Sequence, residues 1–162
     1  RKMNKKKIVI ALAVILIIII VAVILFLQKN KENIQINIEG LAEEITKSNA
    51  FEDQLEKIDS EMTMQDYNFS TDEVAQLVSY QGSGASSEEI VILQVKEKSN
   101  INSVKDKINT RLAERKEAFE SYLPEEVGKI DNSILRVEGN YIILCVAKDA
   151  NTVNNVINEY IK

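Results

Sequence analysis

Residues 8–27 form an unbroken run of twenty apolar residues, and this run constrains the chain more than any other feature. A bilayer core is about 30 Å thick and an α-helix rises about 1.5 Å per residue, so about twenty apolar residues are needed to span it. The run has this length and contains no charged side chain. The sequence therefore predicts a single-pass membrane protein whose transmembrane helix, residues 8–27, contacts the lipid bilayer.

The two flanks of the run differ in charge. Residues 1–7 carry five basic side chains, whereas residues 28–32 carry two basic side chains and one glutamate. The more positively charged flank of a transmembrane helix stays in the cytoplasm. We therefore expect an uncleaved signal anchor in the cell membrane, with a cytoplasmic N-terminus and an extracytoplasmic C-terminal domain.

Two other classes of protein also begin with an apolar run. A cleaved signal peptide has an apolar region of about 7–15 residues and a cleavage site of small residues. This run is longer and ends in Phe26-Leu27-Gln28-Lys29, which offers no such site. A bacterial lipoprotein needs a cysteine at the end of the run, and the only cysteine is Cys145. Both alternatives are therefore less favoured than the anchor.

The part of the chain after the run is acidic. All 25 Asp and Glu residues follow it, whereas five of the 20 Lys and Arg residues precede it, so residues 28–162 carry a net charge of −10. This charge argues against binding to nucleic acid. The length suffices for one domain with its own core. We expect a cytoplasmic tail (1–7), the transmembrane helix (8–27), a stalk (28–40) and a domain (41–162).

The start of this domain is predicted to be helical. Leu41, Ala42 and Ile45 recur at helical spacing and indicate a short helix over 41–47. Asn49 followed by Glu52 resembles a capping box, and it predicts a second helix whose inner face carries Phe51, Leu55 and Ile58. Around residues 62–70 the pattern is weak and indicates a helical turn at most.

From Glu73 onward the apolar pattern changes to strands. Val74–Gln81 alternates with a period of two, although a period of 3.6 also fits, so a strand is favoured over a helix. A Gly/Ser loop at 82–87 joins it to a β-branched run at 89–96, as in a hairpin. Three further elements follow in chain order: an amphipathic helix ending at Tyr122 before Pro124, a hairpin of Ser133–Val137 and Tyr141–Ala147 with a type II′ turn at Gly139-Asn140, and a helix over 150–160.

These elements predict an α+β fold. After short N-terminal helices the order is ββαββα, which suggests a two-layer sandwich with a four-stranded, mainly antiparallel sheet and helices on one face. The strand at 141–147 is apolar on both faces, so it should be central, with the N-terminal helices or a partner on the second face. The strand and helix of each half match at offsets of 51 and 52 residues. This similarity fits either an old duplication or, more simply, the shared demands of a strand followed by a packed helix.

The composition excludes several kinds of catalytic site. The chain has no histidine and one cysteine, so it cannot form the common zinc ligand sets or Ser-His and Cys-His pairs. We therefore predict no catalytic residue, no metal site and no cofactor, and a protein that is not an enzyme. Three adjacent glutamate pairs, at 43–44, 88–89 and 125–126, are predicted to be solvated surface charges. Cys145 lies in an apolar run and is predicted to be a small buried side chain.

A few residues are candidates for contact with a ligand or partner. The loop at 82–87 resembles a phosphate cradle, but such cradles open into a helix and this one precedes a strand, so a plain hairpin connection is favoured. Arg115 interrupts an apolar stripe, where it could bind an anion or pack its stem while its head reaches water. The candidates for contact are Gly82, Ser83, Gly84, Ser86, Arg115, Tyr122 and Tyr141.

Three motifs carry a resemblance to a known family. They are Tyr80-Gln-Gly-Ser-Gly-Ala-Ser-Ser-Glu-Glu-Ile90, Tyr122-Leu-Pro-Glu-Glu126 and Glu138-Gly-Asn-Tyr141. Over residues 41–162 the chain resembles an uncharacterised domain-of-unknown-function family of small secreted or membrane-attached Firmicutes proteins, many described as lipoproteins. The resemblance implies no activity, cofactor or catalytic residue. The lipidated cysteine is missing here, which favours the anchor.

Two hypotheses for function follow from these observations. The leading one is a non-enzymatic binding or interaction module of the cell envelope with an envelope protein as partner. The alternative is a small-ligand-binding envelope sensor or transport accessory protein, which would need a pocket lined by Tyr80, Tyr122 or Tyr141. An enzyme that uses carboxylates alone is a distant third.

Overall fold

The computed structural model describes residues 12–23 and 34–162, which belong to two separate compact units. Residues 12–23 are helical and their side chains are exposed. Among the described residues, no helix is both long enough and apolar enough to cross a membrane. Residues 8–11 and 24–27 of the predicted transmembrane helix lie outside the described residues, as do the tail and residues 28–33 of the stalk.

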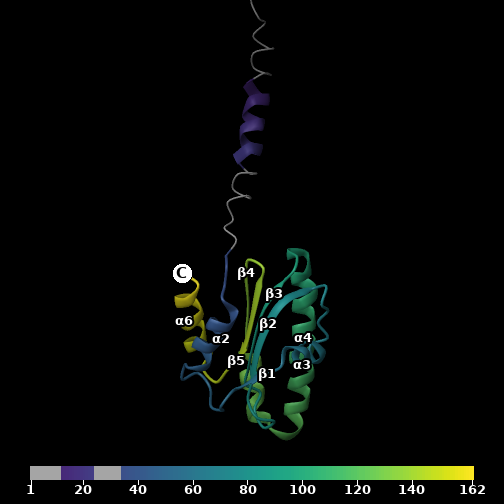
Figure 1. The fold of residues 1–162 in the computed structure, drawn as a ribbon, viewed down its shortest axis with the longest axis vertical. Helices are drawn as coiled ribbons and strands as arrows, with labels where there is room; N and C mark the ends of the chain where they lie inside the picture. The colour runs from purple at the N-terminus through teal and green to yellow at the C-terminus, as the bar shows by residue number, and fades with distance from the viewer. Residues whose placement is uncertain (1–11, 24–33) are drawn as a thin grey trace, which may run out of the picture. The chain divides into compact units, whose positions relative to one another are not determined.

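Residues 34–162 form an α+β domain built on one antiparallel sheet (Figure 1). The sheet has five strands in the order β1-β2-β3-β5-β4. The strands are β1 (Glu56–Ile58), β2 (Val74–Gln81), β3 (Glu89–Val95), β4 (Ile134–Glu138) and β5 (Tyr141–Val146). The expectation of four strands was therefore one too few, because β1 adds an edge strand beside β2.

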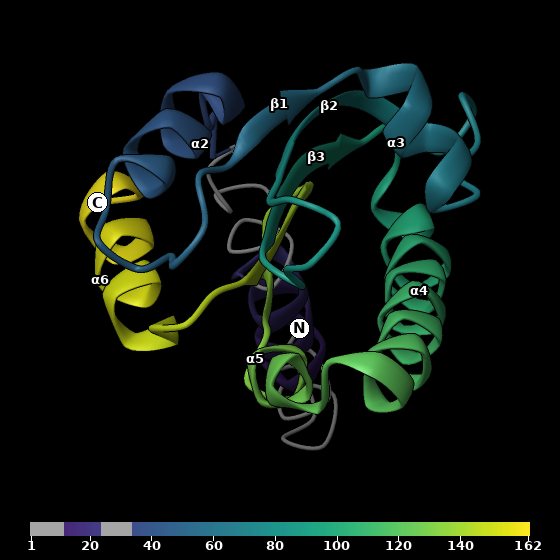
Figure 2. The same cartoon turned by 90° about the horizontal axis from the view of Figure 1, so that it is seen from below.

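Helices cover both faces of this sheet, as Figure 2 shows. One side carries α2 (Ile38–Thr46) and α6 (Ala150–Tyr160), and the other carries α3 (Ser60–Asp66), α4 (Ile101–Tyr122) and α5 (Val127–Asp131). The predicted two-layer arrangement was wrong, and the domain has three layers. The prediction that the N-terminal helices help to cover the second face is confirmed for α2.

The two central strands explain the three layers. All six residues of β5 are buried, and alternate side chains point to opposite faces. Ile143 lies in the core beneath α2 and α6, with Val153 of α6. Leu144 lies in the other core, with Val104 of α4. A central strand with two apolar faces needs a helix layer on each side, since either face left open would expose this surface to water.

The N-terminal segment departs most from the sequence-based expectation. The first helix exists, but it begins at Ile38, where Asn37 caps it by accepting a hydrogen bond from the N–H of Gly40 at 3.1 Å. The helix predicted after Asn49 is absent, and residues 56–58 form β1 instead. Phe51 and Leu55 still pack against the core beneath α2 and α6, so their apolar spacing marks contact with the core rather than a helix.

The strand at 74–81, α4, the β4–β5 hairpin and α6 were predicted correctly, whereas α3 was expected to be a helical turn at most and α5 was not predicted. Residues 74–81 form a strand, with an irregularity in register between Val74 and Gln76. The long helix α4 ends at Tyr122, and Pro124 begins a short 3-10 turn that leads into α5. Gly139 has a φ of +60°, the sign that a type II′ turn requires at its first central residue. Asp149 caps α6 by accepting hydrogen bonds from the N–H groups of Asn151 and Thr152.

Candidate functional site

The loop between β2 and β3, residues 82–88, brings several of the candidate residues together. The loop is closed by a hydrogen bond from the N–H of Gly82 to the carbonyl of Glu88, at 2.9 Å. Two residues of α4 donate to loop carbonyls: Tyr122 to Gly84 and Arg115 to Ser86, both at 3.3 Å. The end of α4 and the Gly/Ser loop therefore form one surface region, although they are far apart in the sequence.

Asp53 holds the loop from its other side. Its Oδ2 accepts a hydrogen bond from the N–H of Ser83 at 2.7 Å, and the hydrogen bonds from Ser83 hold the pKa of Asp53 below its usual value. A Cβ atom at Gly82 would lie 2.9 Å from this oxygen, so a larger residue there would have to displace the Asp53 carboxylate. No atom lies within 4 Å of a Cβ placed at Gly84, which leaves that position open.

Tyr141 is not part of this region. It lies at the opposite end of β5, pairs with Gln94 and is buried beneath α2. Its hydroxyl donates to the side chain of Gln35 at 3.4 Å. The structure thus brings together six of the seven candidate residues and places the seventh in the core.

The charged residues beneath the loop were missed by the sequence analysis. Glu88, Glu89 and Glu126 are buried, so the prediction that the pairs 88–89 and 125–126 are solvated surface charges was wrong for these three. It was right for Glu125 and for the pair 43–44, which are exposed. The position of Glu88 and Glu89 in the sequence could have predicted their burial. They lie at the start of a strand whose residues are apolar on both faces, and side chains on such a strand are buried.

Glu88 connects three parts of the chain. Its carboxylate accepts hydrogen bonds from the N–H groups of Glu52 at 3.0 Å, Asp53 at 2.8 Å and Lys148 at 3.2 Å. It thereby joins the loop, the segment before β1 and the segment after β5. A buried carboxylate is tolerated when hydrogen bonds replace its hydration, and here backbone donors supply them.

Lys129, on α5, is the centre of the charge network. Its ammonium group lies 2.9 Å from a carboxylate oxygen of Glu52, 2.9 Å from Glu126 and 3.4 Å from Glu88. The lysine side chain is only 11% exposed. Burial disfavours its charge, but the hydrogen bonds from Lys129 to Glu52 and Glu126 outweigh it and raise the pKa of Lys129. The lysine therefore stays charged and paired.

Two partners of Lys129, Glu126 and Glu52, are held in their ionised form. Burial alone would raise the pKa of Glu126, but hydrogen bonds from the N–H of Ser87 at 2.7 Å, from Lys129 and from the Ser87 hydroxyl at 2.9 Å bring it below its usual value. Glu52 is more exposed, and hydrogen bonds from Lys148 and Lys129 lower its pKa to about 2. All three carboxylates on Lys129 are thus satisfied by internal partners.

Glu89 belongs to a second cluster, on the face of the sheet that α4 covers. It accepts a hydrogen bond from the Tyr67 hydroxyl at 2.8 Å, and Arg115 lies 2.9 Å from its Oε1. Oε1 nevertheless has no well-aligned hydrogen-bond donor among the described residues. Burial is the dominant influence and raises the pKa of Glu89, despite the opposing charge of Arg115.

This shift gives a prediction for pH dependence. The folded state binds the Glu89 proton more tightly than the unfolded chain does, so this group favours folding below about pH 4.3 and loses that contribution as pH rises through the folded pKa. Glu89→Gln removes the titration and adds a pH-independent offset. Urea unfolding from pH 4 to 8 should show the variant gaining stability relative to the natural protein as pH rises. The exposed Glu125→Gln should show no such trend, and a flat difference for Glu89→Gln would contradict the raised pKa.

The chemistry available to these residues is limited. Among the described residues, no cluster of His, Cys, Asp and Glu is arranged to hold a metal ion. Cys145 is buried, and this burial raises the pKa of its thiol well above the usual value, which disfavours the reactive thiolate. The buried carboxylates face internal donors. The charged groups beneath the loop therefore join segments of the chain to one another, and Ser83 and Gly84 of the loop are exposed.

Comparison with known proteins identifies a family. A profile of the domain of unknown function DUF4358 matches residues 47–147. No curated protein and no solved structure matches the chain. The matched segment includes the loop, all five strands and the buried glutamates, and the resemblance to an uncharacterised domain family is confirmed at this level. The chain belongs to the DUF4358 family.

Proposed function

We propose that this protein is a non-enzymatic binding module of the cell envelope. In this proposal residues 8–27 anchor it in the cell membrane, the domain of residues 34–162 is extracytoplasmic, and its partner is an envelope protein. The observation that carries the proposal is the pairing of the charges beneath the loop. Glu88 is engaged by three backbone N–H groups, and Lys129 by three carboxylates.

A catalytic acid or base must reach a substrate, and it works best with a pKa near the working pH. Glu126 and Lys129 have pKa values shifted away from neutrality, because each stabilises the charge of the other. Burial raises the pKa of Glu89 towards neutrality, but its carboxyl group is fully buried under Tyr67 and Arg115. These groups are better suited to holding segments together than to proton transfer.

The hollows of the domain favour a binding surface over a small-ligand pocket. The hollows on the described part of its surface include three of about 470, 290 and 350 Å³. None of the three is lined by Tyr80, Tyr122 or Tyr141, the residues that a small-ligand pocket was expected to use. The linings of the first two are rich in charged side chains, whereas small-molecule pockets are mostly apolar.

The position of the domain can be tested on cells. We expect protease added to intact protoplasts to digest residues 34–162, because the basic flank at residues 1–7 keeps the N-terminus inside. The measurement is an immunoblot with epitope tags at each end, and a cytoplasmic protein serves as control. Loss of the C-terminal tag with retention of the N-terminal tag supports the proposal. Protection of both tags in intact protoplasts, and digestion only after lysis, would overturn the orientation.

The non-enzymatic character has its own test. The purified full chain in detergent micelles should turn over no substrate in a panel of hydrolase and transferase assays. Any activity that disappears in Glu88→Gln or Glu126→Gln, while circular dichroism shows that the variant is folded, would overturn the proposal and assign these carboxylates a chemical role.

A further inference from the structure

The outer edge of β2 is uncovered over half of its length. β1 pairs with only three residues of β2, and the last pair is Ile58 with Ser79. The chain then turns at Asp59 into α3, whereas β2 continues back to Val74. Within residues 12–23 and 34–162, residues 74–78 of β2 therefore have β3 on one side and no paired strand on the other.

The register shows which backbone groups face this open edge. In an antiparallel pair, successive residues direct their N–H and C=O groups alternately to one neighbour and the other. The N–H of Gly82 donates a hydrogen bond to the carbonyl of Glu88 on the β3 side. The backbone N–H and C=O groups of Tyr80 and Val78, two and four residues earlier, therefore also point towards β3. Leu77 must then direct its N–H and C=O away from β3, to the side where β1 has ended. Unpaired groups of this kind are a template for another strand.

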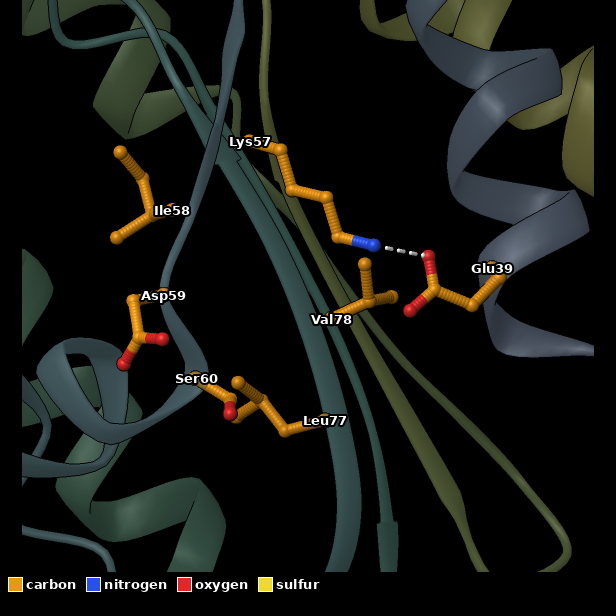
Figure 3. A pocket seen from close by; sticks show the side chains of 7 residues that line it. All are labelled: Glu39, Lys57, Ile58, Asp59, Ser60, Leu77 and Val78. Atoms are coloured by element: carbon orange, nitrogen blue, oxygen red, sulfur yellow. Dashed lines mark hydrogen bonds and ion pairs between the residues drawn. The ribbon is translucent and has the colours of Figure 1, made fainter.

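Two hollows flank this edge, one on each face of the sheet. The first, of about 470 Å³, includes Val78, which belongs to the core beneath α2 (Figure 3). The second, of about 350 Å³, includes Met64 of α3, on the other face. Ser60 and Leu77 line both. A strand laid along the edge places alternate side chains on opposite faces, so its side chains would enter these two hollows in turn.

The surroundings of the edge are acidic. Glu56, Asp59 and Glu61 are exposed, and none of them forms an ion pair with another described residue. Lys57, which lines the first hollow, is already paired with Glu39 at 2.7 Å, as Figure 3 shows. The edge therefore presents unneutralised negative charge, which attracts a positively charged segment.

We propose that residues 74–78 of β2 accept an extended basic segment of a partner protein as an added strand. The segment would bond to the backbone of Leu77, place apolar side chains in the two hollows and direct lysine or arginine side chains towards Glu56, Asp59 and Glu61. Backbone pairing supplies affinity and the flanking hollows supply selectivity, as in other cases of strand addition. This inference rests on the proposed function and names the chemistry of the partner.

The test uses the full chain in detergent micelles and a fluorescent peptide with a central run of valines flanked by lysines, which presents valine to both faces of the sheet. We expect fluorescence anisotropy to show binding that weakens with added salt, and no binding of the matching glutamate–valine peptide. Amide exchange measured by NMR should show the Leu77 N–H exchanging fast in the free protein and slowly with the peptide present. Unchanged exchange at Leu77 in the peptide-bound protein would overturn the proposal.

Two variants separate backbone pairing from charge. Leu77→Pro removes the outward N–H without removing a hydrogen bond to β3. It should lower the affinity for the peptide about tenfold or more. Glu56→Lys leaves the backbone intact and should lower the affinity for the lysine–valine peptide several-fold at low salt. The control Glu159→Lys, on α6, should lower this affinity less. If Leu77→Pro fails to fold, Glu56→Lys and the amide exchange still decide the matter.

Other outcomes distinguish this proposal from the broader one. Self-association that is lost in Leu77→Pro would place a second copy of the chain on the edge and overturn the proposal of a basic partner. If cross-linking on protoplasts captured an envelope protein equally well with Leu77→Pro and with the natural chain, the binding module would stand and the β2 edge would not be its site.

Discussion

Lys129→Met is expected to destabilise the domain by about 3–5 kcal/mol. The substitution removes the charge on which Glu52, Glu88 and Glu126 converge, and two of these carboxylates are buried. Methionine matches the length of the lysine stem, so the loss reflects charge rather than volume. The measurement is urea unfolding followed by circular dichroism at pH 7.

Lys116→Met is the matched control. Like Lys129, Lys116 pairs with a carboxylate, that of Asp131 at 2.6 Å. This pair is more exposed, since the side chain of Lys116 is 37% exposed and that of Asp131 is 52% exposed. Solvent-exposed pairs contribute less than about 1 kcal/mol, so this variant should be nearly as stable as the natural protein. Equal losses for the two lysine variants would show that the buried network has no special weight.

The cost of Lys129→Met should also depend on pH. Lys129 is one of the groups that hold the pKa of Glu126 below its usual value. A depressed carboxyl pKa stabilises the folded state above the unfolded value of about 4.3, and this contribution is lost as pH falls through the folded pKa. The difference in stability between the natural protein and the variant should therefore stay constant near neutral pH and shrink as pH falls below about 4.3.

Glu88→Leu is the second substitution from which we expect a loss of about 3–5 kcal/mol. It leaves the N–H groups of Glu52, Asp53 and Lys148 without their acceptor, and each buried donor left unpaired costs about 1–3 kcal/mol. These donors are partly buried, so water offsets some of the loss. The exposed Glu125→Leu, a matched change, should alter the free energy of unfolding by less than about 0.5 kcal/mol.

Glu88→Gln gives a finer measurement at the same position. The amide keeps one acceptor oxygen but turns its NH₂ group towards a backbone donor, so we expect a loss smaller than that of leucine. Hydrogen exchange should then rise first at the N–H groups of Glu52, Asp53 and Lys148. A loss spread evenly over the domain would indicate that Glu88 does not hold these segments together.

Strong apolar periodicity made most of the fold predictable from the sequence. The apolar stripe of α4 and the alternating apolar residues of β2 were sufficient to predict these two elements, because their inward-facing apolar residues pack in the two cores. Spacing misled the prediction at residues 51–58. Phe51, Leu55 and Ile58 fit a helical face, but Ile58 pairs with Ser79 at the edge of the sheet, and this tertiary pairing prevailed over local helix signals.

Layering could not be predicted from one element at a time. The similarity between the two halves suggested two equivalent strand–helix units, yet α4 and α6 lie on opposite faces of the sheet. Two equivalent units would place their helices on the same face. The similarity therefore reflects the common demands of a buried strand followed by a packed helix, rather than a repeated unit.

The candidate site was predictable only at its surface. Gly84, Arg115 and Tyr122 stood out by residue type, and the structure joins them at one end of the sheet. The charge network beneath was missed because adjacent glutamates usually point into solvent. Its recognition required knowing that Lys129, three residues after Glu126, lies beside the start of β3.

The central position of β5 limits when the chain can fold. β5 lies between β3 and β4 in the sheet, yet it follows both of them in the sequence and therefore leaves a ribosome or an export channel after them. Before they emerge, β3 and β4 have no common neighbour, and the apolar side chains of β3 stay uncovered. Unfinished chains of this kind expose strands that aggregate or are degraded. A product truncated before Tyr141 should therefore be removed by quality control rather than persist as a shorter module.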